Sequence, residues 1–167
     1  MSFASTSDDS TRFYLSAGLV VVYLFAQLSP LSHLLDPGYW PLGPLWAAYG
    51  WSRGGPSVRS ALVLFALGLL QDTISGGPLG LWPFAYVGAY AAAMAVPAGL
   101  SENAALARAI AAALGLIACA TLAIVTASFS LGAMPPLGPF TVSLALTALL
   151  TPFAGYLFSP PKGRDVY

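Results

Sequence analysis

Charged side chains are scarce in this chain of 167 residues, and their scarcity indicates its class. Only 7% of the residues are Asp, Glu, Lys or Arg, against roughly 25% in a typical soluble domain. Hydrophobic residues make up 57%, which leaves too little polar side chain to cover a surface that faces water. The composition therefore predicts a polytopic membrane protein. Because the formal net charge is zero, it also argues against the basic face that a nucleic-acid-binding protein needs.

Cysteine and histidine are almost absent. Cys119 has no second cysteine with which to form a disulfide, and it stands inside an apolar run, so we expect a packing residue. His33 is the single histidine, which excludes a site with several histidine metal ligands, and no serine–aspartate arrangement accompanies it. No ionisable residue lies deep in a predicted span, as a coupled transporter would need. The sequence therefore predicts neither an enzyme nor a metal or cofactor site.

Long apolar runs are what the chain does contain. A membrane-spanning helix needs about 20 apolar residues, and five runs reach that length: Phe13–Leu31, Val58–Ile74, Leu79–Leu100, Leu106–Phe129 and Leu137–Phe158. A sixth run, Tyr39–Trp51, is shorter and carries two prolines, so it is a short second helix, a kinked helix or an interfacial segment. The prediction is an all-α bundle of six transmembrane helices over residues 13–158. Residues 1–12 are expected to form a disordered cytoplasmic tail, and residues 159–167 a short cytoplasmic tail.

The cationic residues predict the orientation of this bundle. They are Arg12, Arg53, Arg59, Arg108, Lys162 and Arg164. Six helices with a cytoplasmic amino terminus place all six in the cytoplasm, whereas five helices with an outer amino terminus leave Arg12 outside. The positive-inside rule favours the first scheme, with both termini cytoplasmic, by that one arginine. In both schemes the loop after Asp72 faces the extracytoplasmic side.

Two of the predicted spans are rich in alanine. The segments GAYAAAMA (88–95) and ARAIAAALG (107–115) place small residues four positions apart. In lipid, helices associate through the close backbone approach that small residues allow, and hydrophobicity contributes little. Packing within the bundle is the favoured interpretation, and it is compatible with a docking face for a partner's helix.

The stretch GLLQDTISGGPLG (68–80) places a carboxylate directly after an apolar run. We expect Gly76 and Gly77 to adopt positive φ values that end the helix, and Pro78 cannot continue it. Asp72 lies in the last turn of that helix, where the helix dipole disfavours an anion, so it needs a compensating partner. Amide groups of the glycine-rich turn are the nearest candidates.

Other partners for this carboxylate remain open at the level of the sequence. The hydroxyls of Thr73 and Ser75 are close along the chain, and water, His33 or a residue of another protein could also serve. Two roles are likewise open: the aspartate fixes the turn and nothing more, which is the favoured interpretation, or the turn presents an outer surface to a partner. The candidate site consists of Asp72, Ser75, Gly76, Gly77, Pro78, Leu79 and Gly80.

The same stretch resembles the family of the rod shape-determining protein MreD. The resemblance is carried by an apolar helix that ends in G-L-L-x-D, a Ser/Gly turn, and P-L-G-L at the start of the next helix. In this chain these are Gly68-Leu69-Leu70-Gln71-Asp72, Ser75-Gly76-Gly77 and Pro78-Leu79-Gly80-Leu81. The preceding Arg53-Gly54-Gly55-Pro56 is similar to the basic loop of that family. Trp82 is a departure, because many members carry a small or polar residue there.

The resemblance implies a non-catalytic inner-membrane scaffold subunit of the bacterial elongation machinery, which supports lateral peptidoglycan synthesis and cell shape. Members of that family pair with the bitopic periplasmic protein MreC. They act with the actin-like MreB, the glycosyltransferase RodA and a penicillin-binding transpeptidase. The fold of the family is similar to the six-helix substrate-binding subunits of energy-coupling-factor vitamin transporters. A solute-binding subunit of that type is the alternative function, although few polar groups are expected on the outer side.

Overall fold

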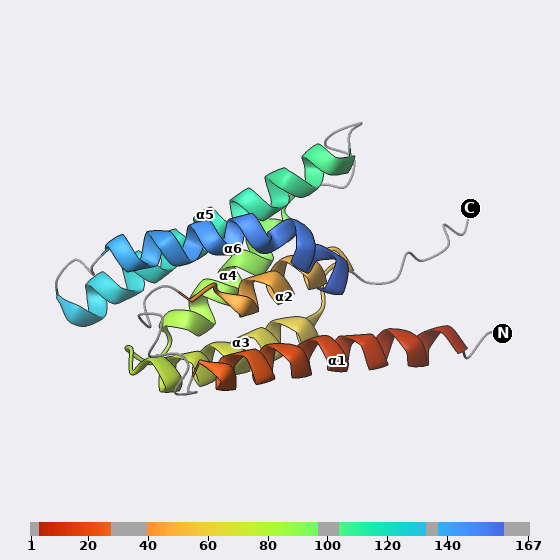
Figure 1. Cartoon of the computed structure of the whole chain (residues 1–167), viewed down its shortest axis with the longest axis horizontal. Coiled ribbons are helices and arrows are strands. Elements are labelled where there is room, and N and C mark those ends of the chain that lie inside the picture. Colours follow the sequence, from red (N-terminus) through yellow and green to blue (C-terminus); the bar gives the residue numbers. More distant parts are fainter. Residues whose placement is uncertain (1–3, 28–39, 97–103, 133–136, 159–167) are drawn as a thin grey trace.

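The computed structural model describes residues 4–27, 40–96, 104–132 and 137–158, and these ranges hold six α-helices and no strand (Figure 1). This confirms the all-α class. The helices are α1 (Ala4–Ala26), α2 (Gly43–Ser52), α3 (Val58–Ser75), α4 (Leu81–Met94), α5 (Ala104–Leu131) and α6 (Leu137–Phe158).

Some predicted boundaries are wrong. Helix α1 begins at Ala4, so residues 4–12 are helical where a disordered tail was expected. Helix α4 begins two residues after Leu79 and ends at Met94, before the predicted end at Leu100. The bounds of α6 agree with the prediction. His33, the residues 159–167 with Lys162 and Arg164, and the predicted end of the first span lie outside the described residues.

Successive helices run in opposite directions, so the starts of α1, α3 and α5 and the ends of α2, α4 and α6 share one end of the molecule (Figure 1). At this end the guanidinium of Arg59 lies 4.2 Å from the ring centroids of both Phe13 and Tyr14. At the opposite end the side-chain amide of Gln71 donates to Gln27 Oε1 over 3.3 Å. Arg12, Arg59 and Arg108 belong to the first halves of α1, α3 and α5, and Arg53 directly follows α2, so these four arginines lie toward the first end.

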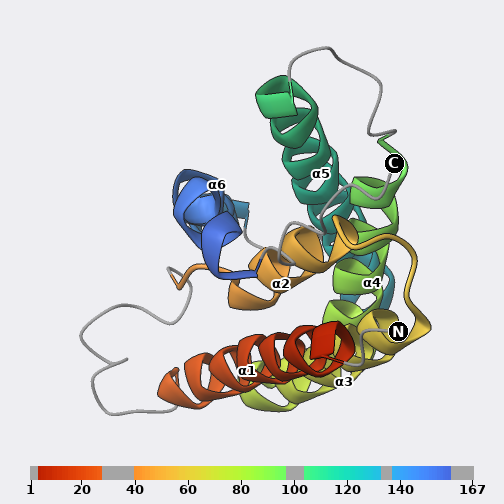
Figure 2. The ribbon, with the colours of Figure 1, turned by 90° about the vertical axis from the view of Figure 1, so that its right-hand side faces the viewer.

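Helix α2 has 10 residues, about 15 Å of helix, which confirms that the second helix is short. Figure 2 shows it in the interior, surrounded by the other helices. Its first turn is anchored halfway along α6, where the Leu42 amide donates to Thr147 Oγ1 over 2.8 Å and Trp46 Nε1 donates to the Thr147 carbonyl over 3.1 Å. The beginning of α2 thus finds its polar partners inside the protein.

Helices α4 and α5 share the most extensive contact among the described helices, and their small residues lie in it. Ala89 and Ala93 of α4 are buried, and a Cβ atom built on Gly115 of α5 would lie 3.3 Å from the Ala89 carbonyl oxygen. A Cβ atom on Gly88 would lie only 2.1 Å from Cδ1 of Leu122. Cys119 is fully buried in the core. Internal packing, the interpretation favoured from the alanine-rich segments, is confirmed for these residues.

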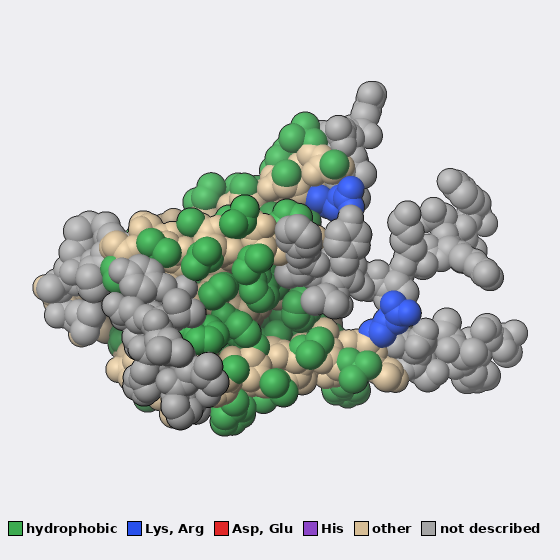
Figure 3. All heavy atoms as spheres, viewed as in Figure 1, with side chains coloured by type: hydrophobic (Ala, Val, Ile, Leu, Met, Phe, Trp, Pro, Cys, Tyr) green, Lys and Arg blue, Asp and Glu red, His purple; other side chains and the backbone are tan. Residues whose placement is uncertain are grey.

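The described surface is apolar while several interior side chains are polar. Figure 3 shows hydrophobic side chains over the length of the visible face, with arginine side chains at its right-hand end. The exposed large hydrophobic residues include Leu15, Leu19, Val22, Phe25, Leu62, Phe65, Phe84, Ile117, Val125, Phe129 and Leu149. The buried polar residues are Ser16, Ser52, Ser60, Gln71, Asp72, Ser143, Thr147 and Thr151. Many large hydrophobic side chains of the described helices are thus exposed, and polar side chains are buried beside the hydrophobic core.

Candidate functional site

The candidate site is the turn that joins α3 to α4, and a left-handed glycine ends the first of these helices. Helix α3 ends at Ser75, and Gly76 follows with a φ of 65°. Gly77 does not share this conformation, so the prediction of positive φ holds for Gly76 and is wrong for Gly77. The second left-handed residue is Gly80, with a φ of 98°, directly before α4. Both positions suit glycine because a Cβ atom strains such a backbone.

The carboxylate of Asp72 reaches across this turn to the start of the next helix. The Gly80 amide donates to Oδ2 over 2.6 Å, and the Trp82 amide donates to Oδ1 over 3.1 Å. Asp72 is 1% exposed. Gly80 is the N-cap residue of α4 and has no side chain with which to cap it. The aspartate therefore performs for α4 the capping that an N-cap side chain usually performs from within the same helix.

With this carboxylate in place, the amide donors of the first turn of α4 are accounted for. The Leu81 amide donates to the Pro78 carbonyl over 3.3 Å, and the Phe84 amide donates to the Gly80 carbonyl over 3.2 Å. Pro83 has no amide hydrogen to satisfy. A helix start leaves up to four amides without partners, and in lipid each of them would cost several kcal/mol. The hydrogen bonds from the Gly80 and Trp82 amides to the Asp72 carboxylate, called the Asp72 bridge from here on, remove that cost at this helix.

The bridge also explains why an anion is tolerated in the last turn of α3. The dipole of α3 disfavours negative charge at its C-terminal end, but the dipole of α4 favours it at its N-terminal end. The Asp72 carboxylate lies at the C-terminal end of α3 and also at the N-terminal end of α4, and it accepts its hydrogen bonds from α4 and the residue before it. The prediction that turn amides compensate this charge is confirmed by the Gly80 contact. The Trp82 contact extends the compensation into the helix itself.

Gly68 allows α4 to come close enough for this bridge. A Cβ atom built on Gly68 would lie 2.3 Å from the Pro83 nitrogen and 2.7 Å from the Trp82 carbonyl carbon. Gly68 and Asp72 are four residues apart and therefore lie on one face of α3. The glycine admits the backbone of α4, and the aspartate one turn later binds its amides. Sequence reasoning quoted this glycine in the motif without assigning it a role, although the Gly-x-x-x-Asp spacing was the available signal.

The remaining polar groups of the turn do not bind the carboxylate directly. The Thr73 hydroxyl donates to the Leu69 carbonyl over 2.9 Å, and the Ser75 hydroxyl donates to the main-chain carbonyl of Asp72 over 3.4 Å. The suggestion that these hydroxyls hold the carboxylate is therefore wrong. Leu79 at the tip of the turn is 79% exposed. The outer surface of the site is thus a leucine beside small residues, with the charge underneath it.

Trp82, which departs from the MreD-like pattern, takes part in the site through both its main-chain amide and its ring. Besides donating its amide to Asp72, it stacks its ring on Tyr86 at a centroid distance of 5.4 Å and lies 6.3 Å from the ring of Phe140. The aromatic side chain is therefore packed against neighbours of the same chain. A neighbouring polar pair, Gln71 with Gln27, joins α3 to α1 beside the site, and sequence reasoning missed it because the partners lie 44 residues apart.

Among the described side chains no group of three His, Cys, Asp or Glu residues could hold a metal ion. Comparisons with protein-family models, curated proteins and solved structures give no match. What can be inferred of the function therefore depends on the residues themselves. The arrangement at Asp72 can do one thing chemically: it can hold two helix ends together and shape the outer turn above them.

Replacing Asp72 tests the bridge. In Asp72→Ala the Gly80 and Trp82 amides lose their acceptors inside an apolar environment, which we expect to cost on the order of 3 kcal/mol of unfolding free energy. Asp72→Asn keeps one acceptor oxygen and should lose clearly less. Thermal unfolding of the purified variants in detergent measures the difference. A loss for Asn as large as that for Ala would show that the acceptor count is not what matters.

Gly68→Ala tests the close approach of α3 and α4. The new methyl group would overlap the backbone at Pro83, and such overpacking typically costs about 1–3 kcal/mol. Gly18→Ala is the matched control, because nothing lies within 4 Å of a Cβ atom there, and the higher helix propensity of alanine should leave α1 as stable or more stable. Unfolding midpoints in one detergent compare the two. Equal behaviour of both variants would contradict the assigned role of Gly68.

Proposed function

We propose that this protein is a non-catalytic scaffold of the bacterial inner membrane, similar to MreD, which binds an MreC-type bitopic partner and supports lateral peptidoglycan synthesis. RodA-type glycosyltransferase, penicillin-binding transpeptidase and MreB would be indirect partners. The observation that carries the proposal is the Asp72 bridge beneath an exposed turn, in a bundle with an apolar surface. This turn belongs to the segment that resembles MreD, and the apolar surface of the bundle suits a lipid environment.

The apolar surface supports the membrane location. Two of the described helices, Val58–Ser75 and Ala105–Ser130, are long and apolar enough to cross a bilayer, and Thr11–Ala26 and Gly138–Pro152 are shorter apolar segments. Most of the first two stretches is not buried by the rest of the protein, as expected of helices that face lipid. We propose that the bundle is a multi-pass membrane domain in which α2 is enclosed by the others and does not span alone.

The alternation of helix directions supports the proposed orientation. The first described residue of α1 and the last of α6 lie at the same end (Figure 1), where the described arginines also lie. The positive-inside rule then places this end, and with it both termini, in the cytoplasm. The Asp72 turn lies at the opposite end and would face the periplasm.

The interior gives little support to an enzyme or to the alternative solute-binding subunit. Among the described side chains that are buried, Asp72 is the carboxylate, and both of its oxygens already accept hydrogen bonds from main-chain amides. The groove between α2, α4, α5 and α6 has about 10 Å³ of space that water molecules could occupy, whereas ligand pockets usually measure 300–1,000 Å³. A vitamin-sized solute would not fit there. We therefore favour the scaffold.

Cysteine labelling tests the membrane orientation. In a Cys119→Ala background, Ser75→Cys lies in the exposed part of the outer turn and Gly54→Cys lies in the loop at the arginine-bearing end. An impermeant maleimide should label Ser75→Cys in intact spheroplasts and Gly54→Cys only after permeabilisation, since the two loops are on opposite sides. The reverse pattern would invert the topology. Labelling of both sites in a detergent-free soluble fraction would refute membrane insertion.

Leu79→Gln tests the partner surface. Because Leu79 is 79% exposed, removing its apolar side chain should leave the unfolding midpoint unchanged while weakening association with the co-expressed MreC-type protein about tenfold or more, as loss of an interface anchor does. Microscale thermophoresis in detergent gives the dissociation constant. Leu149→Gln, at an exposed site on α6, serves as the control. Unaltered affinity of the Leu79 variant would place the partner elsewhere.

A further inference from the structure

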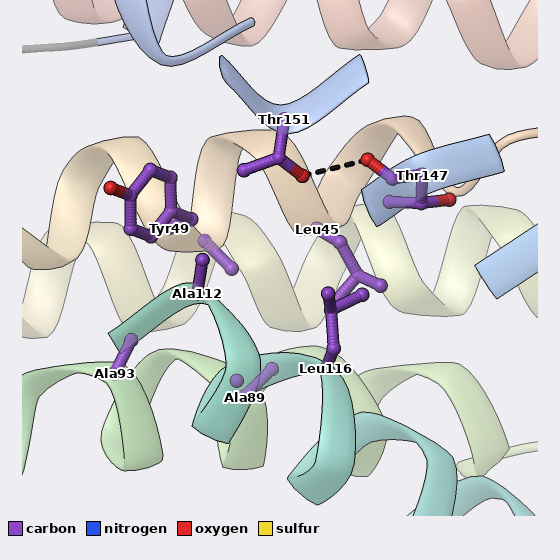
Figure 4. A pocket seen from close by; sticks show the side chains of 10 residues that line it. Leu45, Tyr49, Ala89, Ala93, Ala112, Leu116, Thr147 and Thr151 are labelled. Atoms are coloured by element: carbon purple, nitrogen blue, oxygen red, sulfur yellow. Dashed lines mark hydrogen bonds between the residues drawn. The ribbon is translucent and has the colours of Figure 1, made fainter. Parts of the chain in front are cut away.

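We draw no further inference here: the strongest candidate, the two buried polar side chains on α3 and α4 in which the Gln71 carbonyl oxygen and the Tyr86 hydroxyl have no hydrogen-bond partner within the described part of the chain, carries nothing, because neither residue lines the groove between α2, α4, α5 and α6 (Figure 4) and nothing in the structure shows a ligand that would bind either oxygen.

Discussion

A buried carboxylate that binds the first amides of a neighbouring helix is the constraint on which the rest of this structure depends. Asp72 closes the α3–α4 turn by accepting from Gly80 and Trp82. Without it, the start of α4 would present bare amides to an apolar environment. Because the contact also fixes the separation of α3 and α4, it determines which surface of the turn is presented outward. A charge at this position therefore serves the shape of the turn and is itself hidden from any partner.

The same requirement, that main-chain polar groups be satisfied within the protein, recurs at the other helix ends. At the end that carries the described arginines, the Tyr90 hydroxyl accepts from the Ser57 amide and donates to the Gly55 carbonyl, which ties the end of α4 to the loop before α3. In the interior, Thr147 accepts the Leu42 amide at the start of α2. Side chains from other helices thus satisfy main-chain groups at the starts of α2 and α4 and in the loop before α3. This explains how helices as short as α2 and α4 are accommodated in a bundle with an apolar surface.

The sequence predicted the periodic and apolar features well and the contacts between helices poorly. Apolar runs located α3 and α6 because apolar residues continue through both segments with few interruptions. The helical extension over residues 4–12 was missed because its Ser, Thr and Asp residues are typical of a tail, although a helix can continue beyond a bilayer with its own main-chain hydrogen bonds. The need of Asp72 for amide partners followed from the helix dipole. Its bond to Trp82 did not, because it depends on the closeness of α4 that Gly68 allows.

Amide hydrogen exchange of the protein in lipid nanodiscs, followed by NMR, tests the central claim most directly. The account predicts that the Gly80 and Trp82 amides exchange slowly, together with the helical amides of α4, and that both become fast when Asp72 is replaced by alanine. The Gly77 amide serves as the internal reference for an unprotected loop. Exchange of the Gly80 and Trp82 amides as fast as that of Gly77 in the unaltered protein would contradict the bridge and the account built on it.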